Sequence, residues 1–429
     1  MVNSERKLGV LKIASSLASV HYGLGFLLGT AESVYNSGPA GITYALSCSL
    51  GLIFMAFLVP FYWKNKKPIW ELLGSLYGKK IQKGSCFLSW VWMVGVVGSQ
   101  ILGATYILKT LGLSPTIGMI LITTITSILA LWPIKRLSSV YFSLLLISSA
   151  SLLYVLTKLS PPALFSANFS KSLFSSVTLT PLKTLGIFIP TIFVTVLGMD
   201  FHQFIVRGKT PQKSIFGTIL AGMILIIITL LLTFVVITAA NNHLFPPGID
   251  GKETIPFVLI YIGESLQKMF ISYVLIIALL TAVLGSGSAV SRILIETAQD
   301  LKILPKKMAN RVVIVIFNSC LALFLALTGK SIVSLIVSFY AIYVAGVLVP
   351  FAAYLLERKK IFKFEGNTIY LSLFFGGMTA LLVLIASKIT SFSALFGENV
   401  EFWIISIGIL GSILPIAFST IKQRLQTTG

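Results

Sequence analysis

The chain has 429 residues, of which 56% are hydrophobic and 11% are charged, and its mean hydropathy is +0.95. This balance excludes a soluble globular domain. The formal net charge of +20 could suit a nucleic-acid-binding protein, so the distribution of the basic residues along the chain decides how that charge is interpreted.

Twelve apolar stretches follow one another along the chain, and each is long enough to cross a bilayer as a helix of roughly 20 residues. The runs are continuous and lack the short alternating segments of a membrane barrel. They cover residues 11–33, 40–63, 84–108, 114–133, 138–158, 184–206, 213–240, 267–296, 309–329, 331–356, 367–388 and 401–421. The sequence therefore predicts an all-α membrane protein with about twelve transmembrane helices.

Lysines and arginines alternate between the connections. If the amino terminus is cytoplasmic, the inner segments hold 24 of them and the outer segments hold eight. This asymmetry follows the positive-inside rule. It predicts a multi-pass protein of the plasma (inner) membrane with both termini cytoplasmic, whose basic loops contact anionic membrane lipids. Neither a nucleic acid nor an obligate protein partner is needed to explain the charge.

The first and sixth predicted helices share a weak point beside polar residues. His21 is followed by Gly23 and Gly25, and Asp200 and His202 follow another glycine. A glycine inside a helix costs about 1 kcal/mol relative to alanine, and a charge at membrane depth costs about 2.5 to 3.5 kcal/mol. Both helices are therefore expected to be broken, and these residues are candidates for function.

The likeness of helices one and six predicts a five-helix repeat, and an odd number of spans turns the second copy upside down. This 5+5 inverted repeat is the architecture of many secondary transporters, whose broken helices expose carbonyl groups near the bilayer midplane. The first repeat would cover about 10–160 and the second about 184–356. Two peripheral helices would follow at about 367–421, all within one transmembrane domain, 1–429.

Four stretches, in this order, resemble the sodium:solute symporter family, whose members have this fold. They are "GFLLGTAESVYNSGPAGITYAL" from residue 25, "PIWELLGSLYGKKI" from residue 68, "DFHQFIVRGKTPQKS" from residue 200 and "GSGSAVSRILIETAQDL" from residue 285. The resemblance runs over roughly residues 10 to 310. It implies a symporter that imports a small solute with a cation, and it implies neither a cofactor nor an enzyme activity.

The resemblance also implies a sodium site between helices one and eight. Its helix-one positions fall on Ser19 and Tyr22, and its helix-eight backbone position falls on Thr281. Backbone carbonyls and hydroxyls are oxygen ligands that suit a hard cation. The family's pair of adjacent hydroxyl side chains falls on Gly285 and the residue before it, which is a departure from the pattern. Ser286 is one position away, so a local bulge would restore one hydroxyl.

Proton coupling is the alternative to sodium. His21, Asp200 or His202 could carry the proton, because histidine titrates near neutrality and burial favours a protonated carboxyl group. Other interpretations stay open for the same residues: His21 could bond a carbonyl freed by the break, and Asp200 could cap a helix or pair with Arg207. The "GSGS" stretch could serve only close helix packing.

The solute is expected between helices one and six. Sugars are disfavoured, because the residues that match the family's sugar-binding positions on helices one and two, including Ala45 and Cys48, offer few hydrogen bonds. An amino acid or a small carboxylate is expected instead. The predicted substrate-binding residues are His21, Gly23, Gly25, Phe26, Asp200, His202, Gln203 and Ser288, and the predicted cation-binding residues are Ser19, Tyr22, Thr281, Gly285 and Ser286.

A ligand sensor with the transporter fold is a second class of function. Receptors of this kind usually carry an attached cytoplasmic signalling domain, and only about eight residues follow the last predicted helix. A transporter is therefore expected. An enzyme is not expected, because the sequence has no HExxH, nucleophile-elbow or phosphate-loop motif.

Overall fold

The protein is helical throughout the part of the chain that the structure describes. This computed structural model describes residues 6–131, 134–159, 179–265, 269–301, 308–329 and 331–428. In chain order the helices are α1 (Val10–His21), η1 (Gly25–Gly29), α2 (Thr30–Ser37), η2 (Gly38–Ile42), α3 (Thr43–Met55), α4 (Val59–Asn65), α5 (Ile69–Tyr77), α6 (Lys79–Thr110), α7 (Pro115–Leu131), α8 (Ile134–Lys158), α10 (Pro181–Leu197), α11 (Met199–Ile205), α12 (Pro211–Asn241), η4 (Gly251–Glu253), α13 (Thr254–Ser265), α14 (Met269–Asp300), α15 (Met308–Thr328), α16 (Ile332–Arg358), α17 (Gly366–Ala386), α18 (Thr390–Phe396) and α19 (Val400–Thr428).

The prediction of an all-helical membrane protein is confirmed. Each of the twelve predicted stretches coincides with one helix, or with consecutive helices where the chain is interrupted. Among the described residues, seven stretches are long and apolar enough to cross a membrane, and the bent pair α10 and α11 makes an eighth. Three shorter apolar helices, including α1 and α7, accompany them.

Helix one is broken, as expected. α1 ends at His21, and the chain resumes in the π-helical turn η1, which leads directly into α2. At Gly38 the backbone turns with φ of +58°. η2 then folds back so closely that a Cβ atom on Gly41 would lie 2.2 Å from the carbonyl carbon of Ser33. Residues 25–55 therefore form a half-helix, a tight turn and the start of helix two.

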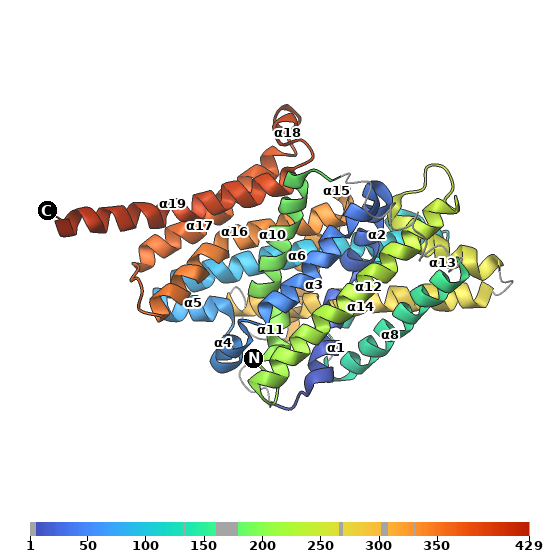
Figure 1. The fold of residues 1–429 in the computed structure, drawn as a ribbon, viewed down its shortest axis with the longest axis horizontal. Helices are drawn as coiled ribbons and strands as arrows, with labels where there is room; N and C mark the ends of the chain where they lie inside the picture. The colour runs from blue at the N-terminus through green and yellow to red at the C-terminus, as the bar shows by residue number, and fades with distance from the viewer. Residues whose placement is uncertain are drawn as a thin grey trace, which may run out of the picture.

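Helix six is broken at Gly198, which also confirms the expectation. α10 ends at Leu197, α11 begins at Met199, and the two axes differ by 45°. α1 packs against α11. These two half-helices adjoin basic segments of the chain, and they lie at the same end of the molecule. The N-terminus is marked beside α4 and α11 in Figure 1.

The long helix α6 lies in the centre of the bundle and is buried along most of its length. It packs against α14, α15, α16 and α5, while α3 lies between α10 and α12. Figure 1 shows α6 running behind α3 and α10 through the middle of the molecule. Of the interrupted helices, α1 packs against α8, α12 and α14, and α10 packs against α3, α16 and α19.

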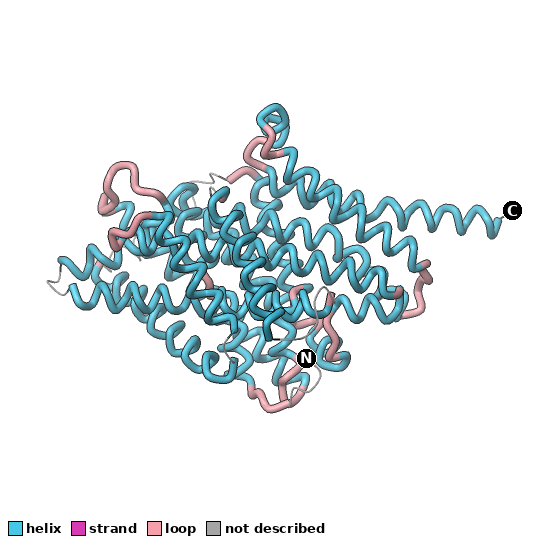
Figure 2. The backbone as a smooth tube through the Cα atoms, turned by 180° about the vertical axis from the view of Figure 1, so that it is seen from behind, coloured by secondary structure: helices cyan, strands magenta, loops and turns pink. Residues whose placement is uncertain are grey.

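The last two long helices, α17 and α19, pack on each other and on α16. Glycines make the approach close: a Cβ atom on Gly376 would lie 2.5 Å from the Ala345 carbonyl oxygen, and one on Gly408 would lie 2.5 Å from the Ala345 Cβ. Such contacts between small residues are a common way to join helices in a bilayer. Figures 1 and 2 show the C-terminal part of α19 extending beyond the rest of the bundle.

The segment before α1 is tied to the loop after α11. The Leu8 N–H donates to the Arg207 carbonyl at 3.0 Å, and the Lys209 N–H donates to the Leu8 carbonyl at 3.0 Å. The Arg6 guanidinium lies 3.3 Å from the ring centroid of Trp63, whose indole N–H donates to the Gly208 carbonyl at 2.9 Å. These contacts hold helices one and six together at this end.

Candidate functional site

The break in helix one leaves backbone groups without their usual hydrogen-bond partners within the helix, and neighbouring groups supply new partners. The Gly23 N–H donates to the His21 carbonyl at 2.7 Å, which forms a tight turn. The Leu24 N–H, which has lost its partner in α1, donates to the Gln100 Oε1 of α6 at 2.6 Å. A buried N–H without a partner would cost about 1 to 3 kcal/mol. The amide of Gln100 therefore stabilises the interrupted backbone.

Ser286 of α14 meets the same break from another side. Its hydroxyl donates to the Val20 carbonyl at 3.1 Å, and its Oγ would lie 2.7 Å from a Cβ atom on Gly23. The sequence places Ser286 in the predicted cation site, and its hydroxyl does lie against the carbonyls at the end of α1. Glycine at position 23 gives the hydroxyl this access.

The other predicted cation-site residues differ in their surroundings. Ser19 is half-buried, and its hydroxyl donates to the Ser15 carbonyl at 2.7 Å, within its own helix. Tyr22 is buried, and its hydroxyl accepts a hydrogen bond from Ser148 of α8 at 2.9 Å. Three helices, α6, α8 and α14, therefore reach the break in helix one.

Thr281 and Gly285 belong to the part of α14 that lies outside the described side chains. Ser288, in the same helix, is fully buried.

Two hydroxyls and one imidazole donate hydrogen bonds to the backbone carbonyls at the break in helix six. The last carbonyls of a helix lack intrahelical partners. Here the Val196 carbonyl accepts from the Tyr62 hydroxyl at 2.8 Å, and the Leu197 carbonyl accepts from the Tyr343 hydroxyl at 3.0 Å. The Nε2 of His202 also lies 2.8 Å from the Val196 carbonyl oxygen. Because a carbonyl only accepts, His202 carries a proton on Nε2.

Stacked rings connect the end of α1 with α11, the half-helix that follows the break in helix six. His21 stacks on Phe201, with ring centroids 4.2 Å apart and planes at 8°. His202 stacks on Tyr62 with centroids 3.8 Å apart. The sequence predicts that His21 and His202 belong to one site, and the structure brings both to the junction of α1, α4 and α11.

Three buried polar atoms at this junction have no hydrogen-bond partner among the described residues. They are the His21 Nε2, the Asp200 Oδ1 and the His202 Nδ1. Asp200 is 3% exposed and forms no ion pair with Arg207 or any other described residue, while its backbone carbonyl accepts from the Gln203 side chain at 2.9 Å. Unsatisfied buried polar groups are rare in folded proteins and mark places where a ligand or a proton can bind.

Gly25 and Phe26, which the sequence places at the solute, face packed neighbours. A Cβ atom on Gly25 would lie 2.1 Å from the Ile336 Cδ1 of α16. Phe26 is 1% exposed, and its ring centroid lies 6.3 Å from that of Tyr22. In this conformation both residues hold η1 against the surrounding helices.

Several of the residues that satisfy the breaks are not among those predicted from the sequence. Gln100 could have been found as the single glutamine in the predicted helix 84–108. Tyr62 and Tyr343 carry no comparable signal: a buried tyrosine hydroxyl usually has a hydrogen-bond partner, but the sequence does not indicate which group that partner is.

A buried ion-pair network lies at the other end of η1 and α2. Glu32 is 4% exposed and Lys252 5%, and the Lys252 ammonium lies 3.4 Å from a Glu32 oxygen and 3.0 Å from Asp250. Glu32 also accepts from the Ile332 N–H at 3.0 Å. Burial opposes ionisation of Lys252, but the charge of Glu32 together with the hydrogen bond and charge of Asp250 outweighs it, and the pKa of Lys252 is raised. Burial likewise opposes ionisation of Asp250, but hydrogen bonds and the charge of Lys252 leave its pKa lowered.

The network joins three segments that are distant in the sequence: α2, η4 and the start of α16. Its members are all satisfied, which is the condition under which a buried ion pair is stable. The network fixes the half-helix after the first break.

The fold has known counterparts, although no protein-family model and no curated protein matches the sequence. A Na+-coupled sialic acid symporter, in a substrate-bound outward-open state, superimposes with a TM-score of 0.74 at 12% identity, over 96% of this chain and 89% of that chain. A nucleobase-cation-symport-1 family transporter, closed with bromovinylhydantoin bound, gives 0.59 at 14% identity over 96% and 93%. A manganese transporter of Eremococcus coleocola, in complex with an aromatic bis-isothiourea substituted compound, gives 0.61 at 12% identity over 97% and 98%.

These likenesses cover nearly the whole chain and show its fold. The protein is a multi-pass membrane protein with the LeuT-type inverted-repeat fold of secondary transporters, in which helices one and six are interrupted. The predicted repeat boundaries and the predicted site residues remain predictions.

Proposed function

We propose that the protein is a cation-coupled secondary transporter of the sodium:solute symporter type, which imports a small organic solute such as an amino acid or a small carboxylate. It would lie in the plasma (inner) membrane with both termini cytoplasmic. The solute would bind between the breaks of helices one and six, near His21, Asp200 and His202. Sodium would bind where α14 meets the end of α1.

One observation supports this proposal most strongly: the Ser286 hydroxyl lies on the Val20 carbonyl at the helix-one break. A carbonyl and a hydroxyl converging from two helices are oxygen ligands of the kind that sodium prefers. The likeness of the fold to a protein described as a Na+-coupled symporter agrees with it. Ser19 precedes Val20 and Tyr22 follows it by two positions, so their carbonyls are further candidate ligands.

The coupling would work through the conformations that the cation stabilises. A cation shared by α1 and α14 favours the conformation in which these helices lie together, and a solute that prefers the same conformation then binds more tightly. Linkage makes the effect reciprocal, so the solute raises the affinity for the cation by the same factor.

Sodium binding can be tested without knowing the solute. We expect purified wild-type protein to unfold at a higher temperature in sodium chloride than in choline chloride, and we expect Ser286→Ala to lose most of this difference because a ligand is removed. Ser99→Ala is the matched control, since Ser99 is a buried serine that bonds only its own helix, at the Val96 carbonyl. An unchanged sodium response in Ser286→Ala would remove Ser286 from the site.

Replacing His202 with alanine is expected to abolish uptake into proteoliposomes while the protein still purifies as a monodisperse species. The substitution removes the hydrogen bond to Val196 and the stacking on Tyr62, which together hold the helix-six break in position. His243→Asn, at an exposed position with φ of +53°, is the control. Normal uptake by His202→Ala would exclude His202 from the transport site.

Proton coupling is the second candidate, and the unpartnered atoms of His21, Asp200 and His202 favour it. A proton bound to Asp200 would remove a buried negative charge, and both histidines can also take up a proton. Imposing a proton gradient in place of a sodium gradient in the same uptake assay separates the two candidates.

A further inference from the structure

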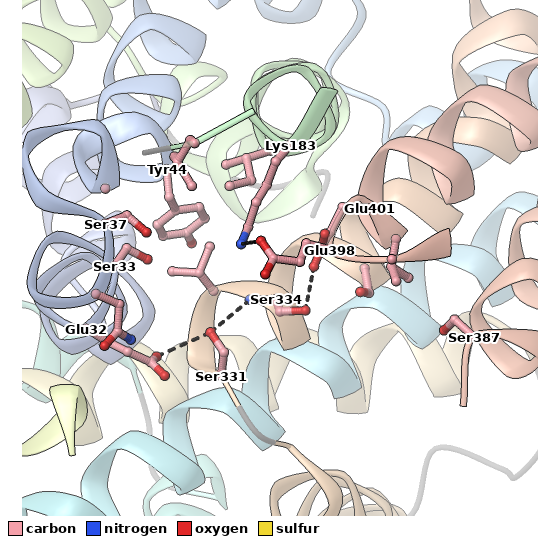
Figure 3. A pocket seen from close by; sticks show the side chains of 18 of the residues that line it. Glu32, Ser33, Ser37, Tyr44, Lys183, Ser331, Ser334, Ser387, Glu398 and Glu401 are labelled. Carbon is pink, nitrogen blue, oxygen red and sulfur yellow. Dashed lines mark hydrogen bonds and ion pairs between the residues drawn. The ribbon is translucent and has the colours of Figure 1, made fainter. Parts of the chain in front are cut away.

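A cavity of about 400 Å³ lies away from the two breaks, at the end of the molecule that carries η2 and α18. Side chains from α2, α3, α10 and α16 line one side of it, and side chains from α17, α19 and the segment between them line the other. Figure 3 shows this arrangement, with Glu401 and Glu398 on one side and Ser33, Ser37 and Tyr44 on the other. The volume lies within the range of small-molecule pockets.

Two of the three carboxylates that line the cavity are already neutralised. Glu32 is paired with Lys252 at 3.4 Å. Glu398, whose side chain is 83% exposed, is paired with Lys183 at 3.6 Å. Neither group needs a charged ligand.

Glu401 differs from both. It is 5% exposed, lines the cavity and forms no ion pair with any described residue. Its one hydrogen bond to a described group comes from the hydroxyl of Ser334. Removing a carboxylate from water is costly unless a cation and hydrogen bonds compensate. A cationic group in the cavity would supply what Glu401 lacks.

The rest of the lining favours a ligand with hydroxyl groups. Besides the carboxylates and two lysines, the polar side chains are almost all hydroxyls, which both donate and accept hydrogen bonds. They are Ser33, Ser37, Tyr44, Ser331, Ser334, Ser338 and Ser387. An apolar ligand would leave these groups without partners.

We propose that this cavity is a second binding site, which takes a small organic ammonium ion that carries hydroxyl groups, with the ammonium on Glu401. Tyr44 separates it from the helix-one break: Tyr44 lines the cavity, and its hydroxyl lies 3.5 Å from the Cβ position of Gly25. The helices outside the two predicted repeats then have a function of their own, because α19 supplies Glu401.

Binding to detergent-solubilised full-length protein tests this proposal, since neither a membrane gradient nor transport is required. Three probes share one pyranose ring and differ in charge: glucosamine, glucose and glucuronate. We expect glucosamine to raise the unfolding temperature in a saturable manner, and glucose and glucuronate to have no saturable effect. The cation distinguishes the first probe from the other two.

Variants locate the site. Glu401→Gln keeps the size of the side chain and is expected to weaken glucosamine binding by about tenfold or more, as the loss of a charged hydrogen bond would. Glu398→Gln, in the same cavity but exposed, should leave binding unchanged. Ser387→Trp, which fills the cavity without changing a charge, should abolish binding even if Glu401→Gln fails to fold.

Equal responses to the three probes, or unchanged glucosamine binding in Glu401→Gln and Ser387→Trp, would overturn the proposal. The result does not depend on the proposed transport function. If wild-type protein bound glucosamine but showed no sodium response, only the central cation site would be contradicted.

Discussion

Replacing Lys252 with methionine is expected to lower the free energy of unfolding by about 3 to 5 kcal/mol, the cost of leaving a buried charge without its partner. Glu32 would remain 4% exposed and would keep only uncharged partners, including the Ile332 N–H. Its half-helix would then lose the ion pair to η4. Denaturant unfolding in detergent measures the change.

Two further variants make this result specific. Lys213→Met removes an exposed lysine and should change stability by less than about 0.5 kcal/mol. The double variant Glu32→Gln with Lys252→Met removes both charges and should regain much of the lost stability, because breaking a buried pair costs more than removing both of its charges. A single variant as stable as Lys213→Met would contradict the role of this pair.

The second large effect is expected from Gly23→Ala, which should abolish the stabilisation by sodium. The added methyl group would lie 2.4 Å from the Gln100 amide nitrogen and 2.7 Å from the Ser286 hydroxyl, so both side chains must move. One movement deprives the Leu24 N–H of its partner, and the other takes the hydroxyl from the Val20 carbonyl.

Gly9→Ala is the matched control, because a Cβ atom at Gly9 meets nothing within 4 Å. Thermal unfolding of both variants in sodium and in choline measures the effect. If Gly23→Ala kept the full sodium response, the cation would have to bind away from this break.

The interruptions of helices one and six could be predicted from the sequence because their cause is local. Glycines next to polar residues weaken a helix wherever it lies, and both breaks occur at such positions, at Tyr22 to Leu24 and at Gly198. The contact of Ser286 with Val20 could be predicted only to within one residue, since the family pattern falls on Gly285 and the residue before it. Its contact with Val20 depends on how α14 is rotated about its axis.

The residues that satisfy the breaks could not be predicted in the same way. Tyr62 and the Val196 carbonyl are 134 positions apart, and Gln100 and Leu24 are 76 apart. Glu32 and Lys252 belong to segments that are distant in the sequence. Such pairs depend on the packing of whole helices, and single-sequence patterns contain no information on that packing.

The cavity beside Glu401 could be predicted still less, because it depends on how several helices pack together. Its lining comes from segments spread between residues 32 and 401. The sequence predicts that the last two long helices are peripheral, because they lie outside the repeat. Their packing on α16 nevertheless brings a buried carboxylate to the edge of the core.

The proposed transport activity is tested most directly by accumulation in proteoliposomes. Wild-type protein would be supplied with a mixture of labelled amino acids and small carboxylates under an imposed sodium gradient, a proton gradient or neither, and the lumen analysed by mass spectrometry. We expect at least one solute to be concentrated above its external level under the sodium gradient alone. No accumulation under either gradient would contradict a cation-coupled transporter.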